Sequence, residues 1–376
     1  MSKIWAKCIE HWGCSAHISL LKLWLERSRD HPLTISLRGV QSSERQDLLF
    51  ENIYRWKTAA VTMDVGLADR LTDELRNNAP LLKSLNIFAA NSHLEYPGIT
   101  GVLASLPNLR QLSSSYTLLN NFSDFHWPKL THLNFSKRLD TKECLKVLSC
   151  CPSIENAAFD EFSPLPQDLS HTPIITLPHL RTLQIYYDHD DQHRSGSARL
   201  EDAGQLLAHL TLPSLRTLLC PTPADHKIIQ HLHDRSNCNI HMMNFDMSIP
   251  ESAMIVHVEL RCFQSLRYLH LFTVVSDALV LHLTWHPVTR PFLPHLKDVL
   301  LFDCRTTDGV LSDMVASRRK PSEGVPCLLE RLGVQYHSMA PIEGVIPYSV
   351  DAAAFREFSA QGMRISHINN INIQRT

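Results

Sequence analysis

The apolar residues of the chain recur in a short pattern, in which an apolar anchor is followed after two residues by two further apolar positions that stand two apart. The clearest copies also carry a proline two residues before the anchor, and they read Pro80-Leu-Leu82-Lys-Ser-Leu85-Asn-Ile87, Pro128-Lys-Leu130-Thr-His-Leu133-Asn-Phe135 and Pro178-His-Leu180-Arg-Thr-Leu183-Gln-Ile185. Further copies begin at Pro107, Pro152, Pro213 and Pro294, and copies without the proline begin at Trp56, Ile240, Leu266 and Leu329. The anchors lie about 27 residues apart on average, within the period of leucine-rich repeats.

The spacing within each copy predicts one strand with a buried side. Residues two apart point to the same side of a strand, so the last two apolar positions enter one core, and the anchor joins them from the turn before the strand. A single strand with three buried side chains is not stable alone, whereas stacked copies share a continuous core. A proline ahead of the strand also ends the helix that precedes it.

Helical segments are expected between the strands. Asp140 followed by Glu143 is typical of a helix N-terminus, and similar character is found over Leu200–Leu210, Ala224–Asp234 and Asp308–Ser317. The sequence therefore predicts an α/β leucine-rich-repeat solenoid (horseshoe), with parallel strands on the concave face and helices and irregular turns on the convex face. An all-helical chain would have no reason to place proline at the same point of so many copies.

Three regions follow from this pattern. Residues 1–50 should form an N-terminal helix and a capping strand, residues 51–340 the irregular repeats, and residues 341–376 a C-terminal capping helix and strand. A polar stretch at 187–199 is predicted to be an insertion that forms a surface loop.

The composition excludes several classes of function. Among 376 residues, 36 Lys and Arg stand against 38 Asp and Glu, and this balance disfavours a nucleic-acid partner. The chain has 12 glycines and lacks both phosphate-binding glycine motifs and the G-x-S-x-G of serine hydrolases, so no cofactor is predicted. It also lacks a secretory signal and an apolar run of about 18 residues, which predicts no membrane contact and a cytoplasmic or nuclear location.

The chain has 22 histidines and 10 cysteines, so metal sites and a nucleophilic cysteine must be considered. The stretch from Asp188 to His193 offers metal ligands but lies in the predicted loop, and His231, His233 and His241 have no Cys-x-x-Cys beside them, so no metal site is expected. Free, buried thiols, as at Cys151 and Cys220, are the favoured interpretation of the cysteines. A Cys/His nucleophile stays open because such pairs meet only in space, but the favoured expectation is that the protein is not an enzyme.

Four segments, in this order, resemble the region after the F-box in fungal F-box proteins of the mushroom lineage. They are a leucine-rich helix over Ser19–Ser28, the strand-like His31-Pro-Leu-Thr-Ile-Ser-Leu37, the strand-like Arg55-Trp-Lys-Thr-Ala-Ala-Val61, and a closing helix, Gly-Met turn and strand in Phe355-Arg-Glu-Phe-Ser-Ala-Gln-Gly-Met-Arg-Ile365. The resemblance covers nearly the whole chain and is specific in the order of its parts.

The resemblance implies a role in ubiquitin ligation with one condition attached. The family's F-box is absent, and Ile4-Trp5-Ala6 resembles only its closing segment. A Skp-type adaptor and a cullin are therefore implied as partners only if an F-box precedes this chain, which would then be the substrate-binding part of the receptor. A freestanding binding or inhibitory scaffold, unconnected to ubiquitin, is the alternative.

The candidate binding site lies on the predicted concave face, where residues flanking the buried strand positions point outward. Aromatic side chains with polar neighbours are typical of protein-binding surfaces. This hypothesis assigns partner binding to Tyr186, Tyr268, His270, Phe272 and Phe302. The alternative is that loops or the C-terminal segment cover Phe272 and Phe302, which would then serve packing alone.

Overall fold

The chain divides into two compact units, residues 1–167 and residues 168–376. This computed structural model describes residues 18–37, 42–89, 98–114, 122–162, 169, 172–186, 203–220, 225–245, 250–285, 292–319, 329–336 and 348–367. The boundary falls inside the predicted repeat region, between two successive copies of the pattern. The predicted insertion at 187–199 lies outside the described residues.

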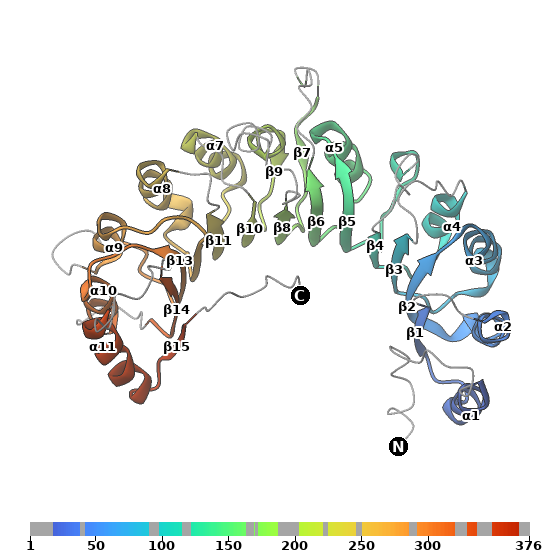
Figure 1. The fold of residues 1–376 in the computed structure, drawn as a ribbon. Coiled ribbons are helices and arrows are strands. Elements are labelled where there is room, and N and C mark those ends of the chain that lie inside the picture. The colour runs from blue at the N-terminus through green and yellow to red at the C-terminus, as the bar shows by residue number, and fades with distance from the viewer. Residues whose placement is uncertain are drawn as a thin grey trace. The chain divides into compact units, whose positions relative to one another are not determined.

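The first unit is a parallel sheet in which the strands follow chain order. Its strands are β1 (Leu33–Leu37), β2 (Trp56–Met63), β3 (Ser84–Ala89), β4 (Gln111–Ser114), β5 (His132–Leu139) and β6 (Asn156–Phe162). Its helices are α1 (Ile18–Ser28), α2 (Ser43–Phe50), α3 (Val65–Asn78), α4 (Ile99–Ser105) and α5 (Thr141–Ser149). Helices α2 to α5 lie on one face of this sheet and leave the other face free of helices (Figure 1).

The second unit repeats this arrangement. Its main sheet is parallel and consists of β8 (Thr182–Ile185), β10 (Thr217–Leu219), β11 (Met242–Phe245), β12 (Tyr268–Leu271), β13 (Asp298–Cys304), β14 (Arg331–Tyr336) and β15 (Arg364–His367). Its helices are residues 203–208, α7 (His226–Ser236), α8 (Glu251–Val258), α9 (Asp277–Leu283), α10 (Val310–Arg319) and α11 (Ser349–Ala360). The predicted α/β class with parallel strands is therefore confirmed, and each unit is a parallel-strand solenoid.

The core of each unit is the predicted stack of apolar strand positions. Leu85, Leu112 and Leu133 are register partners on successive strands of the first unit, and all three are buried. Leu183 and Leu269 hold the same position in the second unit, where both are fully buried. Because every copy contributes to one continuous core, each strand depends on its neighbours for stability.

The helices begin where the sequence predicts them. Asp140 and Glu143 form a complete capping box at α5: the side chain of Asp140 accepts from the backbone N–H of Glu143 at 2.7 Å, and the Glu143 carboxylate accepts from the backbone N–H of Asp140 at 3.1 Å. Helices α7 and α10 confirm the segments expected near 224–234 and 308–317.

The expected closing elements of the chain are also present. Helix α11 is followed by Gly362, whose φ of +89° suits glycine after a helix, and then by strand β15. The carboxylate of Asp308 accepts from the backbone N–H groups of Val350 and Asp351 at 3.0 and 2.9 Å, so it caps the first turn of α11. These contacts attach the C-terminal helix to the turn that precedes α10.

Two features of the second unit are not part of the repeat pattern. The short strands β7 (Ile175–Thr176) and β9 (Leu210–Thr211) form a separate parallel pair ahead of β8 and β10. The register between β13 and β14 shifts between Leu301 and Cys304, where Asp303 has a φ of +50°. This second irregularity bears on the candidate site, because Phe302 lies within it.

Candidate protein-binding face

The helix-free face of the second unit carries the predicted aromatic side chains of β12. Leu269 and Leu271 are buried in the core, so the alternating Tyr268 and His270 lie on the opposite face. Phe272 continues the same row just after the strand, where its backbone N–H donates to the carbonyl of Phe245 at 2.8 Å. The partial exposure of these three positions agrees with the alternation that placed them outward.

The pairing of β12 with β13 brings Phe302 next to Phe272. The register joins Tyr268 to Asp298 and His270 to Leu300. The rings of Phe272 and Phe302 stack with centroids 4.3 Å apart and an interplanar angle of 20°, and the His270 ring lies edge-on to Phe272 at 6.4 Å. Ring pairs of this kind add about 0.5–1.5 kcal/mol beyond the area they bury. We call Tyr268, His270, Phe272 and Phe302 the aromatic cluster.

The members of the cluster differ in exposure. Tyr268 is 41% exposed, whereas His270, Phe272 and Phe302 are half-buried. The two phenylalanine rings cover one another in part, but they still reach the surface. The cluster thus combines one projecting phenol with a partly open apolar floor.

Tyr186 does not join this cluster. It follows β8, and strands β10 and β11 lie between β8 and β12 in the sheet. At a strand spacing of about 4.8 Å, the separation is about 14 Å. Tyr186 is 38% exposed, so it remains a surface residue of the same unit at a distance from the other four.

Charge on this face is concentrated beside the cluster. Burial, together with the positive charge of Arg331, lowers the pKa of His270 to about 4, so the ring is uncharged near neutral pH. Burial also raises the pKa of Asp298, although Arg331 and Arg364 oppose this shift. Asp298 lies 3.6 Å from the Arg331 guanidinium, which places an ion pair next to Tyr268.

Two apolar residues that the sequence analysis did not assign to the binding site also lie on this surface. Met242 is the register partner of Tyr268 on β11, and Leu300 is the partner of His270 on β13; both are half-buried. The same period-two pattern would have found them, had every outward position been weighed instead of the aromatic ones. With them, the apolar surface extends over three adjacent strands.

The helix-free face of the first unit has a different character. Its rows carry small and amide side chains, as in the register series Ser84, Gln111, His132 and Asn156. The side chains of His132 and Asn156 are hydrogen-bonded at 2.9 Å. Phe88 on β3 is a half-buried aromatic side chain of this face, but the stacked pair of rings lies in the second unit, and for that reason the candidate site is placed there.

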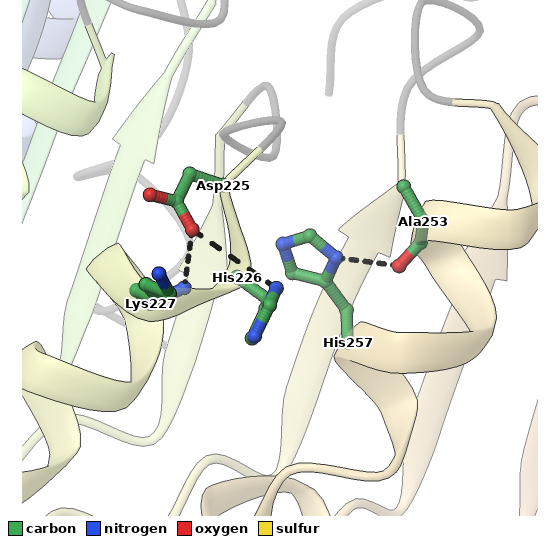
Figure 2. Close-up of polar contacts among 5 residues, drawn as sticks. All are labelled: Asp225, His226, Lys227, Ala253 and His257. Atoms are coloured by element: carbon green, nitrogen blue, oxygen red, sulfur yellow. Dashed lines mark hydrogen bonds and ion pairs between the residues drawn. The ribbon is translucent and has the colours of Figure 1, made fainter.

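A pair of histidines lies on the helix-covered side of the second unit (Figure 2). The rings of His226 and His257 approach edge-on with centroids 6.3 Å apart, and Nδ1 of the buried His257 is 2.8 Å from the carbonyl of Ala253. Asp225 accepts from the backbone N–H of Lys227 at 2.9 Å and thereby caps α7. The described residues contain no group of three or more His, Cys, Asp or Glu side chains arranged for a metal.

The buried thiols do not have the properties of nucleophiles. Burial raises the pKa of Cys220 and of Cys262 to about 12, and that of Cys238 to about 11. A reactive cysteine needs a lowered pKa, because the thiolate is the nucleophile. At neutral pH these side chains are therefore protonated and act as small apolar residues.

Comparisons with known proteins assign no family to the chain. No protein-family model matches it, and no curated protein matches it. A crystal structure of a protein from Bacteroides fragilis is similar over 78% of this chain and 72% of that one, with 14% sequence identity and a TM-score of 0.35. A similarity this low carries no argument about function. Among the helices that the structure describes, none is long and apolar enough to cross a membrane.

Proposed function

We propose that this chain is a non-catalytic leucine-rich-repeat scaffold that recognises a protein through the aromatic cluster. The observation that carries this proposal is the exposed Tyr268 beside the stacked rings of Phe272 and Phe302, on a sheet face that none of the described helices of the unit covers. Aromatic side chains supply much of the binding energy at protein interfaces. The neighbouring Asp298–Arg331 pair and the uncharged His270 would give such an interface its polar rim.

We further infer that the scaffold is the substrate-binding part of an F-box-type ubiquitin ligase receptor in the cytoplasm or nucleus. The ordered resemblance to fungal F-box proteins supports this inference. In that role the cluster would hold the substrate, and a Skp-type adaptor and a cullin would join only through an F-box that precedes this chain.

The alternative is a freestanding binding or inhibitory scaffold without a link to ubiquitin. The position of the cluster supports this alternative, because its register pairs and its stacked rings lie within β11 to β14 and their connections. A face built in this way does not depend on an adaptor.

Affinity purification from the native cells tests the proposal. Tagged wild-type chain is compared with a Tyr268→Ala, Phe272→Ala double variant and with Leu281→Ala, a matched loss of an exposed apolar side chain from α9. At about 2 kcal/mol for each lost anchor, the double variant should bind its partner about a thousandfold more weakly, while Leu281→Ala should bind normally.

The proteins recovered separate the two functions. Adaptor and cullin subunits beside the partner support the ligase receptor, and a partner without them supports the freestanding scaffold. A folded double variant that recovers the same proteins as the wild type would refute the role of the cluster in either function. Thermal unfolding of each variant establishes that it is folded.

A further inference from the structure

A column of basic side chains crosses the second unit at the edge where its strands begin. In each copy the residue directly after the anchor occupies this position, and in four adjacent copies it is Arg181, Arg216, His241 and Arg267. The three arginines are exposed and His241 is half-buried. We call these four residues the basic column.

Backbone hydrogen bonds fix the four residues side by side. The N–H of Arg216 donates to the carbonyl of Arg181 at 2.9 Å, that of His241 to Arg216 at 2.7 Å, and that of Arg267 to His241 at 2.8 Å. The flanking register pairs, which run from Thr182 through Thr217 and Met242 to Tyr268, agree with this order. Three strand spacings of about 4.8 Å give the column a length of about 14 Å.

No acidic side chain neutralises the column within the described part of the chain. The side chains of Arg181, Arg216 and Arg267 have neither an ion pair nor a hydrogen bond to any described residue. Like charges on neighbouring strands are destabilising, so stability alone gives no reason for this series. The next copies are different, because Lys297 is paired with Glu330 at 2.6 Å and Arg331 with Asp298 at 3.6 Å.

The pKa of His241 is affected by the positive charges around it. Its pKa is lowered by burial first, and then by the charges of Arg267, Arg216 and His295. Two guanidinium groups on adjacent strands therefore act on the same imidazole, as the backbone register places them.

We propose that the basic column binds a short, extended acidic segment of a polypeptide. Guanidinium groups bind carboxylates through paired hydrogen bonds, and an unneutralised series of them is complementary to a series of carboxylates. An extended chain advances about 3.4 Å per residue, so a segment of about five residues spans the column. The site itself is inferred from the basic column. Only the further step, that the acidic segment belongs to the protein bound by the aromatic cluster, rests on the proposed function.

The surroundings of the column favour a short acidic peptide over a long polyanion. A nucleic acid is held by dense positive charge, whereas this chain has a net charge of −2. At one end the column stops at the Lys297–Glu330 pair, and the carboxylates of Glu330 and Asp298 would repel phosphates that continued across β13 and β14. The adjoining Tyr268 belongs to the aromatic cluster, so one bound protein could use both surfaces.

Fluorescence anisotropy with a labelled peptide that contains about five consecutive Glu and Asp residues tests this site. The full chain is compared with an R181Q/R216Q/R267Q variant and with K227Q/R261Q/R356Q, which removes the same charge from exposed positions on α7, the turn after α8, and α11. At about 20 mM salt, loss of the three arginines should weaken peptide binding about tenfold. The control variant should bind like the wild type, and about 150 mM salt should weaken wild-type binding.

Three outcomes would overturn the proposal. These are equal binding by the wild type and the arginine variant, equal weakening in the control variant, and column-dependent binding of a single-stranded thymidine oligonucleotide that is tighter than binding of the peptide. If the arginine variant does not fold, the single variant R216Q should weaken peptide binding about twofold. Unchanged binding by a folded R216Q would then refute the site. Peptide binding should be unaffected by Tyr268→Ala and Phe272→Ala, so failure of this site is distinguishable from failure of the aromatic cluster.

Discussion

His270, a residue of the aromatic cluster, makes the stability of the folded protein depend on pH. Its ring projects from β12, edge-on to Phe272 and close enough to Arg331 to be affected by its charge. Because burial and this arginine lower its pKa from 6.5 to about 4, the folded protein holds the ring uncharged where the unfolded chain would accept a proton. Stability then depends on pH in a predictable direction.

The His270→Gln substitution should change the acid stability of the protein. Above about pH 6.5 the ring is neutral in both states and has no linkage effect, whereas between about pH 6.5 and pH 4 only the unfolded chain binds the proton. Relative to His270→Gln, the wild type should therefore lose about 2–3 kcal/mol of unfolding free energy as the pH falls through this range. Urea unfolding at several pH values measures the difference.

The difference between the two proteins is informative because folding also changes the pKa values of other groups. The raised pKa values of Asp298 and Asp351 act in the opposite direction, and they are present in both proteins. His179→Gln, at an exposed position, serves as the control. This variant should show the same dependence of unfolding free energy on pH as the wild type. Parallel profiles for wild type and His270→Gln would contradict the assignment.

At this scale, the sequence alone could place the outward residues of a strand but not their neighbours. Alternation with the buried Leu269 and Leu271 was enough to predict Tyr268 and His270 on one face. The contact between Phe272 and Phe302 depends on the register of two strands whose anchors stand about 30 residues apart, and on the irregularity at Asp303. Neither of these can be read from the repeat itself, and Tyr186 was grouped with the others for the same reason.

At the scale of elements, a buried arginine on α10 connects this helix to the end of α9 and to the turn before β13. Arg318 on α10 is 4% exposed. Its Nε donates to the carbonyl of Leu283 at 2.7 Å, and its Nη atoms donate to Leu293 at 3.2 Å and Phe292 at 3.1 Å. The guanidinium thus donates to the carbonyl at the end of α9 and to two carbonyls in the turn before β13.

Replacement of Arg318 by Met should destabilise the second unit by about 3 kcal/mol, because it leaves buried carbonyl groups without donors. Arg318→Lys should recover only part of this loss, since one ammonium cannot reproduce the planar set of donors. Chemical denaturation measures both effects, with the exposed Arg356→Met as the control. A Lys variant as stable as the wild type would show that charge, and not the hydrogen-bond geometry, is what α10 requires.

The sequence predicted helices and strands correctly where the spacing of apolar residues or a helix-capping pair marks them. The anchors predicted the strands, and Asp140 with Glu143 predicted the start of α5. The pair formed by β7 and β9 was missed because strands of two residues contain too little alternation to be recognised. The basic column was missed as a site for another reason: its three arginines and His241 are ordinary basic residues in the sequence until the backbone register places them side by side.

At the scale of the whole molecule, each unit gains its stability from contacts between neighbouring copies. Leu269 is fully buried in the second unit and is a register partner of Met243 and Val299. A cavity at this position should therefore weaken the strands beside it before it affects the first unit.

The Leu269→Ala substitution should cost about 3 kcal/mol of unfolding free energy. Amide hydrogen exchange should show the largest loss of protection in β11, β12 and β13, and little change in β2 and β3. Leu281→Ala, at an exposed site on α9, should change neither. Equal loss of protection in both units would contradict a core built by nearest neighbours.

The proposed function depends most directly on whether a protein contacts the helix-free face at Tyr268. Site-specific photo-crosslinking in the native cells measures this, with p-benzoylphenylalanine placed at position 268 in one protein and at position 281 on α9 in another. The account predicts a discrete protein adduct from position 268 that is absent from position 281 and is lost when Phe272 and Phe302 are changed to Ala. The same adducts from both positions, or an adduct at 268 that persists in a folded Phe272→Ala, Phe302→Ala variant, would contradict it.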